Sequence, residues 1–266
     1  MDLDPERSSA KWSEAMEKGP NEELLRGNLD AARERLDSLT GGSLPGKAGS
    51  LSPGLAYAAF DDALRAAGLA RGLGEAEEAL RPLLATAARA AVPVVRDNAG
   101  SAAEGEGEGE EAELVDRSAA NPWTLVRGLY AAAVSGERDA ARALAAVPVA
   151  DLRSGQVEAS PALEAYAAAL QRASAGDSPR GADAELDALL GASGGSRGAG
   201  DRFWTRQAEA LARVRAGDAD GFRAALDRVR EALAAEYADA GPNDAERLLE
   251  LPLLGLEALA RRAFGS

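Results

Sequence analysis

The chain of 266 residues contains no histidine and no cysteine. Without these residues it cannot form a Ser-His-Asp or Cys-His nucleophile, a Cys/His metal site, a disulfide or a thiol nucleophile. It also lacks a glycine-rich phosphate loop of the Walker or Rossmann type after a strand. We therefore predict no catalytic residue, no metal site and no cofactor, and we expect that the protein is not an enzyme.

Isoleucine is also absent, and aromatic residues make up only 4% of the chain. Alanine, by contrast, occurs 63 times. Because alanine is the best helix former and β-branched residues favour strands, this balance predicts a mainly α-helical protein. Its core must then consist largely of leucine and alanine, with closely packed helices.

Basic residues are the minority: 30 Lys and Arg stand against 44 Asp and Glu, so the formal net charge is −14. Binding to nucleic acid or to an anionic membrane surface requires a basic patch, so neither is an expected partner. The negative charge fits a basic protein partner, and it fits equally well a role in solubility alone.

Long apolar runs are missing as well. No run of about 18 apolar residues occurs, so no transmembrane helix is expected. The first residues, MDLDPERSSAKW, are polar and acidic, which is unlike a secretory signal. These features predict a cytoplasmic protein.

Apolar residues recur at helical spacing along most of the chain. Asn121-Pro122 and Ser160-Pro161 each combine a helix cap with a proline in the first turn. Pro252 is expected to kink the apolar last segment or divide it in two. The predicted helices are 20–39, 53–72 with Gly68 and Gly72 at its end, 75–91, 121–135, 137–146, one from 160, one from 178, 204–216, 218–238 and the last segment at 246–265.

These elements predict a multi-helix array of α-hairpins, similar to a helical repeat, in one domain over 20–266. Residues 1–19 would form an N-terminal arm or a short helix. The segments VPVVRD (92–97) and AELVDR (112–117) look extended and predict a small β-hairpin insertion at 93–117, with strands at roughly 93–98 and 112–117. Its tip, 99–111, would be mobile, because glycine alternating with glutamate buries no apolar area.

The predicted tip concentrates five carboxylates within eight positions. A Ca²⁺ site needs ligands at fixed positions on a rigid turn, and the Gly-Glu alternation offers charge without that geometry. The segment is therefore either a solvated tip or a contact for a basic partner. The candidate partner-binding residues are Glu104, Glu106, Glu108, Glu110 and Glu111.

One supersecondary unit occurs twice. Trp123-Thr124 precedes Gly136, and Trp204-Thr205 precedes Gly217 at the same spacing. Each unit predicts a helix, a tight glycine turn and a second helix. The two tryptophans could stack on a ligand, but their places on apolar helix faces favour packing in the core. The expected core aromatic residues are Trp123, Tyr130, Tyr166, Trp204, Phe222 and Tyr237.

Carboxylates are the remaining candidates for chemistry. The pair Asp61-Asp62 is followed by ALR, without the further acidic residues that a diphosphate-binding aspartate motif needs to hold Mg²⁺, so we expect a solvated helix face. A glycosidase needs two carboxylates that face each other across a cleft. Spacing alone does not identify such a pair among 44 acidic residues.

The order of these features resembles the immunity protein 49 family of bacterial polymorphic-toxin systems. The resemblance covers about residues 50–264 and is most specific over 121–155 and 203–264. Two features depart from the family pattern: the Gly-Glu expansion of the hairpin tip, and the lack of a histidine near Tyr237. The segments that carry the resemblance are VPVVRD, AELVDR, NPWTLVRGLYAAAVSGERDAARALAAVPVADLRSG, FWTRQAEALARVRAGDADGFRAALDRVREALAAEY and LELPLLGLEALARRAFG.

The resemblance implies a small cytoplasmic protein that binds a cognate toxin and neutralises it without catalysis, by covering part of its surface. The acidic charge suggests a basic toxin such as a nuclease. Two alternatives stay open at this stage: a helical-repeat scaffold or regulatory binding module, and a carboxylate-dependent enzyme. The oligomeric state does not follow from the sequence.

Overall fold

The secondary structure of this protein is helical wherever the structure describes it. The structure is a computed structural model, and it describes residues 20–41, 51–98, 119–152, 160–176, 179–181, 183–191 and 199–265. Over these ranges it contains α-helices and one short 3₁₀ helix and no strand. None of these helices is long and apolar enough to cross a membrane.

The helices follow one another with short connections wherever both ends of a connection are described. In chain order they are α2 (Glu22–Thr40), α3 (Pro53–Gly72), α4 (Glu77–Asn98), α6 (Pro122–Ser135), α7 (Arg138–Ala145), the 3₁₀ helix η3 (Val149–Leu152), α8 (Pro161–Ala175), α9 (Ala184–Gly191), α10 (Ala199–Ala216), α11 (Ala219–Glu236), α12 (Ala245–Leu249) and α13 (Leu251–Phe264).

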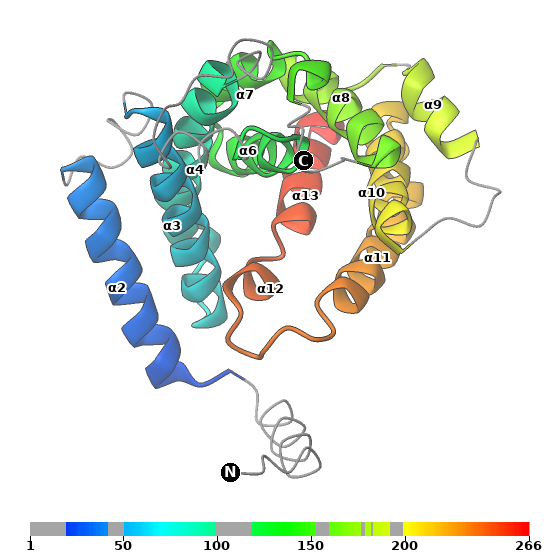
Figure 1. Ribbon diagram of the computed structural model, residues 1–266. Helices are drawn as coiled ribbons and strands as arrows, with labels where there is room; N and C mark the ends of the chain where they lie inside the picture. The colour runs from blue at the N-terminus through cyan, green and yellow to red at the C-terminus, as the bar shows by residue number, and fades with distance from the viewer. Residues whose placement is uncertain are drawn as a thin grey trace, which may run out of the picture.

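Most of the helices form an arc, and the last two helices, α12 and α13, lie inside it (Figure 1). Along the arc, α2 packs on α3, α3 on α4, α4 on α6, and α10 on α11. The chain then returns to the interior, where α12 packs on α3 and α13 on α6, α10 and α11. This return joins the two ends of the arc through α12 and α13.

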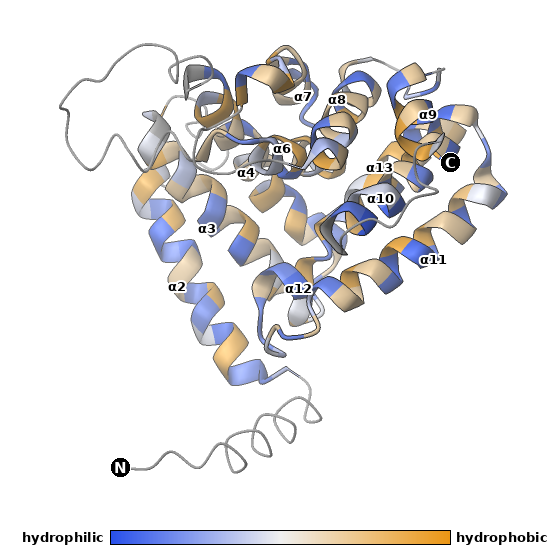
Figure 2. Ribbon diagram, turned by 45° about the vertical axis from the view of Figure 1, so that its right-hand side comes forward, coloured by the Kyte–Doolittle hydropathy of each residue, from blue (hydrophilic) through white to orange (hydrophobic). Residues whose placement is uncertain are grey.

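One continuous cluster of buried apolar side chains extends from Leu25 in α2 to Ala263 in α13. It consists mostly of leucine and alanine, as the composition predicts. Hydrophobic and hydrophilic residues alternate along the outer helices α2 and α11 (Figure 2), which is the pattern of helices that bury one face.

Helix ends follow the local signals of the sequence. The side chains of Asn121 and Ser160 accept hydrogen bonds from the backbone amides of Thr124 and Leu163, at 2.9 and 3.2 Å, so both predicted caps are confirmed. The last segment is divided as predicted, with Pro252 in the first turn of α13. Glu250, at the division, has a left-handed backbone with φ of 48°.

The predicted β-hairpin is wrong. Residues 93–98 continue α4 as helix, although Pro93 lies inside it. Val95 joins the main core, and Val94 packs in a second small cluster with Ala56 and Ala119. Burial on helical spacing therefore outweighs the β propensity of the two valines, which amounts to less than about 1 kcal/mol each. The partner segment 112–117 and the tip 99–111 lie outside the described residues, as does the N-terminal segment 1–19.

Two further predictions about helix ends need correction. Gly68 lies inside α3, where a Cβ atom would come within 1.9 Å of the carbonyl oxygen of Ala245, so this glycine allows α12 to approach. The helix expected from residue 178 begins at Ala184 instead. Asp183 accepts the amide of Leu186 at 3.1 Å there, as a cap residue does.

The repeated unit is present as α6–Gly136–α7 and α10–Gly217–α11. Both glycines have a left-handed backbone, with φ of 80° and 74°. The two tryptophan rings meet edge to face, with centroids 5.2 Å apart. The two units therefore pack against each other through their equivalent tryptophans.

Candidate functional site

Helix α12 is surrounded by hollows in the protein surface. One, of about 360 Å³, lies between α12 and α3, and another, of about 410 Å³, lies between α12 and α11. A narrow, mainly apolar cleft beside α6 adjoins both hollows. We call this area the α12 surface, and its main lining residues are Asn28, Asp61, Arg65, Trp123, Arg127, Arg230, Ala234, Tyr237, Asn243, Glu246, Arg247 and Leu248.

Three contacts hold α12 in this position. Gly68 brings the backbone of α3 close to Ala245, as described above. Asp244 caps α12 by accepting the amide of Arg247 at 2.9 Å. Beyond the helix, the carboxylate of Glu250 pairs with Arg71 of α3 at 2.7 Å. The short helix is thus fixed at both ends although it has little helical stability of its own.

Arg127 is the charged residue at the centre of the α12 surface. Its side chain is only 11% exposed, and it pairs with Glu246 at 2.6 Å. Its guanidinium also lies over the rings of Phe60 and Trp123, 5.3 and 5.7 Å from their centroids. A buried arginine needs such partners because an unpaired charge away from water is costly. Arg127 therefore links α6 to α12 and to α3.

Tyr237 lies at the end of α11, half-buried beside this pair. Burial raises the pKa of its hydroxyl, and the negative charge of Glu246 raises it further. The phenol is therefore protonated at neutral pH, and its hydroxyl can donate a hydrogen bond to a partner. It is not a nucleophile under those conditions.

A chain of aromatic and polar side chains leads from this surface into the core. The ring of Trp204 contacts that of Trp123 and stacks on that of Tyr166, with centroids 5.9 Å apart. The hydroxyl of Tyr130 hydrogen-bonds that of Tyr166 and donates to the side-chain oxygen of Gln207 at 2.8 Å. The floor of the α12 surface is thus held by buried contacts between α6, α8 and α10.

The expected core aromatic residues differ in exposure. Tyr130, Tyr166, Trp204 and Phe222 are buried. Trp123 and Tyr237 are partly exposed, and both line the α12 surface together with one edge of Tyr130. The five glutamates proposed for partner binding, Glu104, Glu106, Glu108, Glu110 and Glu111, lie outside the described residues.

Sequence reasoning missed Arg127 and Glu246. Arg127 stands four residues after Trp123, so a search for aromatic–arginine pairs on one helix face could have found it. Glu246 carries no local signal, since only the return of the chain to α3 brings it next to Arg127.

The acidic groups of this surface pair with arginines of neighbouring helices. Asp61 lies 4.0 Å from Arg127, whereas Asp62 pairs with Arg35 of α2 at 2.7 Å, so the two aspartates serve different helix contacts. Within the described residues, no group of three acidic side chains is placed to hold a metal ion. What the surface does offer is aromatic edges, a tyrosine hydroxyl and arginines, the groups that recur at protein–protein interfaces.

Comparison with known proteins identifies the family. The family model described as Immunity protein 49 matches residues 59–264, which is most of the chain. This range includes α4 to α13 and all but a few residues of the α12 surface. Comparisons with curated proteins and with solved structures give no match. With a match of this length, the chain belongs to the immunity protein 49 family.

Proposed function

We propose that this protein binds a cognate protein toxin stoichiometrically and neutralises it by covering part of its surface, without catalysis. The observation that carries the proposal is the family match over residues 59–264. We further propose that it acts in the cytoplasm, as the family resemblance implies. Cell fractionation of the tagged chain tests that location.

The α12 surface is the proposed contact area for the toxin. It is hollowed, and it exposes parts of Trp123 and Tyr237 at its centre. Partly exposed tryptophan, tyrosine and arginine side chains are the residues that most often dominate the free energy of binding at interfaces. The buried contacts beneath them keep this surface in one conformation, so that little ordering is needed on binding.

A basic toxin, such as a nuclease, fits the net charge of −14. Charge of one sign attracts a partner of the opposite sign over distances near the Debye length of about 8 Å at physiological salt. The run from Glu104 to Glu111 would contribute to this attraction. In this proposal the acidic run raises the association rate, and the α12 surface supplies the specific contacts.

Co-expression tests the function directly. The toxin encoded next to this gene is expressed with and without the chain, and cell survival is measured together with a pull-down of the two proteins. We expect survival and a stoichiometric complex. Absence of both would refute the immunity function and favour the scaffold alternative.

Two neighbouring alanines of α11 test the α12 surface. Ala234 is exposed and lines the hollow between α11 and α12, whereas Ala235 is exposed but does not line it. We expect Ala234→Arg to weaken toxin binding about tenfold or more, because a long charged side chain occupies the hollow. Ala235→Arg is the matched control, with the same charge and helix propensity, and should bind as the wild type does. Equal affinities of the two variants for the toxin would show that the toxin contacts another part of the protein surface.

The acidic run has a separate test. Replacing Glu104, Glu106, Glu108, Glu110 and Glu111 with glutamine should slow association with the toxin and flatten its dependence on salt, with little change in dissociation. Stopped-flow or surface-based kinetics at several salt concentrations measure both rates. An unchanged salt slope would show that the run takes no part in binding.

A further inference from the structure

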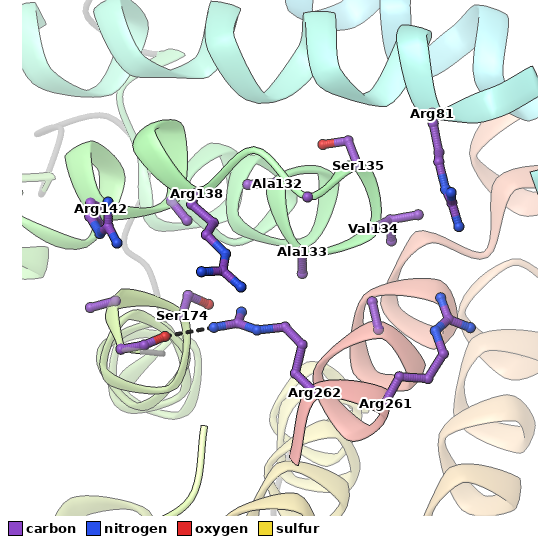
Figure 3. Close-up of a pocket in the computed structure, with 15 residues that line it drawn as sticks. Arg81, Ala132, Ala133, Val134, Ser135, Arg138, Arg142, Ser174, Arg261 and Arg262 are labelled. Carbon is purple, nitrogen blue, oxygen red and sulfur yellow. Dashed lines mark hydrogen bonds between the residues drawn. The ribbon is translucent and has the colours of Figure 1, made fainter. Parts of the chain in front are cut away.

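A second hollow lies on another side of the molecule, where the ends of α6 and α8 meet α7 and α13. It has a volume of about 330 Å³ and is half enclosed. Five of the described residues that line it are arginines, and none of those lining residues is Asp or Glu. We call it the arginine pocket. The arginines are Arg81, Arg138, Arg142, Arg261 and Arg262, and Figure 3 shows them arranged around the opening.

This concentration of positive charge is unusual for a chain whose net charge is −14. For Arg81, Arg142 and Arg261, carboxylates that pair with them stand outside the pocket lining. Glu77 contacts Arg261 at 3.0 Å and Arg81 at 3.5 Å. Asp139 contacts Arg142 at 3.3 Å, but its own side chain is 99% exposed and points to solvent. The pocket is thus lined by cationic groups while its counter-charges stand at its edge.

Ser174 adds a second, independent feature of the pocket. Its residue is only 5% exposed, and its hydroxyl is buried without a hydrogen-bond partner among the described residues. A buried hydroxyl normally has a partner, because leaving it without one costs free energy. In Figure 3 the Ser174 side chain lies beside Arg138 and Arg262, on the wall of the pocket. Its hydroxyl can donate to a ligand there.

Arg138 and Ala141 in the first turn of α7 also border the pocket, as does Arg142 in its last turn. The preceding residue, Glu137, makes no capping hydrogen bond with its side chain, which instead pairs with Arg89 at 2.8 Å. The amide end of a helix attracts anions. The positive end of α7 therefore adds to the positive charge of the pocket.

Capping of helix ends explains one of the five arginines. Arg262 donates to the carbonyl oxygen of Gly176 at 2.6 Å, beyond the end of α8. This contact stabilises α8, as arginines near helix C-termini do. It does not explain why four other arginines share the same hollow, or why the Ser174 hydroxyl is left without a partner beside it.

We propose that the arginine pocket binds a compact phosphate-bearing anion of the diphosphate class. Guanidinium groups match the oxygens of phosphate with paired hydrogen bonds. A diphosphate carries several negative charges in a small volume, whereas a carboxylate carries one, so it suits five guanidiniums in a pocket of this size. The described part of the lining contains no aromatic ring on which a base could stack. Recognition is therefore directed at the phosphate groups and not at a nucleobase.

The test uses sodium pyrophosphate as the probe and needs no toxin, so its outcome is separate from that of the immunity function. Isothermal titration calorimetry and thermal unfolding are measured with pyrophosphate, and with citrate and chloride at matched ionic strength. We expect pyrophosphate to bind the wild type and to raise its Tm. Citrate and chloride should have much weaker effects. Equal effects of citrate and pyrophosphate would overturn the phosphate class, and no binding at millimolar pyrophosphate would overturn the site.

Two exposed arginines provide a matched pair of variants. Arg142 pairs with Asp139 three residues before it, and Arg223 of α11 pairs with Asp220 in the same way, at 2.7 Å. Of these two arginines, only Arg142 lines the arginine pocket. We expect Arg142→Gln to weaken pyrophosphate binding by about tenfold or more, because it removes a charge-assisted hydrogen bond. Arg223→Gln has the same change in charge and should bind within about twofold of the wild type.

Ser174→Ala tests the buried hydroxyl. Since this hydroxyl has no partner among the residues that the structure describes, its removal should leave the Tm without ligand unchanged or slightly higher. We expect pyrophosphate to bind this variant about fivefold more weakly. Unchanged affinity in both Arg142→Gln and Ser174→Ala would show that pyrophosphate binds elsewhere and would refute the proposal.

Discussion

The units α6–α7 and α10–α11 share a Trp-Thr pair at the same spacing before a turn glycine, but they occupy different surroundings. α6 packs against α4, α7, α8 and α13, and ten of its fourteen residues are buried. α11 packs mainly on α10 and α13, and five of its eighteen residues are buried. The first unit thus supplies a helix, α6, to the interior of the molecule, and the second presents the outer face of α11 to solvent and to the α12 surface.

The two tryptophans run the other way, because the tryptophan of the second unit is the more buried one. Trp204 is 8% exposed and contacts Trp123, Phe203 and Tyr166. Trp123 holds the same place in its own unit, but it is partly exposed beneath Arg127. Equal local sequence therefore produces equal local structure, while burial depends on which helices pack there later in the chain.

The largest expected effect is on Trp204. Trp204→Ala should lower the free energy of unfolding by about 3–5 kcal/mol, because it removes a large side chain from the middle of the aromatic cluster. Trp123→Ala should lower it by less, about 2 kcal/mol, because part of that ring already contacts water. Urea unfolding of both variants measures the difference. A larger loss for Trp123 would show that Trp123, and not Trp204, is the more confined of the two rings.

The interior unit also depends on Gly255 of α13, where a Cβ atom would come within 2.0 Å of the Tyr130 ring. Gly255→Ala should therefore lower the free energy of unfolding by about 1–3 kcal/mol. Gly27 is a matched helical glycine in α2, with no atom within 4 Å of its added Cβ. Gly27→Ala should instead raise the free energy of unfolding, by about 0.5–1 kcal/mol. Stabilisation by both changes would contradict the close packing of α13 on α6.

The buried hydroxyl of Tyr130 distinguishes the two units further. Tyr130→Phe should cost about 1–2 kcal/mol of unfolding free energy, because Tyr166 and the oxygen of Gln207 lose a buried partner. The comparison is Tyr237→Phe on α11, which is half-buried and should change stability by less than about 0.5 kcal/mol. Chemical denaturation measures both, and equal losses would show that the two hydroxyls are equally confined.

The glycine turns are the feature at which the effect should be the same in both units. Gly136 and Gly217 have left-handed backbones, and an added Cβ meets no close atom at Gly136 and only ordinary contacts at Gly217. Gly136→Ala and Gly217→Ala should therefore each cost about 1 kcal/mol, from backbone strain alone. A clear difference between the two unfolding free energies would show that the turns are not equivalent.

Much of the fold follows from short-range signals. Helical spacing predicts the helices, Asn121 and Ser160 predict two of the caps, and Pro252 predicts the division between α12 and α13. The prediction fails at 93–98, where two valines favour a strand in isolation and Pro93 disfavours the interior of a helix. Val94 and Val95 are helical because their burial against other segments contributes more than local propensity does.

The sites are less predictable than the fold. Trp123, Tyr130 and Tyr237 are recognisable as apolar-face aromatic residues, but nothing in their spacing indicates that two of them reach the surface beside Glu246. The arginine pocket is a more extreme case. Arg81 of α4 and Arg262 of α13 stand far apart in the sequence, and each alone resembles an ordinary surface arginine.

The sequence by itself determined the helical class, the glycine turns of the two repeated units, the absence of histidine and cysteine chemistry, and the resemblance to the immunity protein 49 family. Only the tertiary structure decided which repeated unit is interior, where α12 stands, and which charges meet in the α12 surface and the arginine pocket. The physical reason is the distance along the chain over which each kind of interaction acts. Caps, turns and helical periodicity act over a few neighbouring residues, whereas burial and charge pairing depend on segments brought together when α12 and α13 return to the interior of the arc.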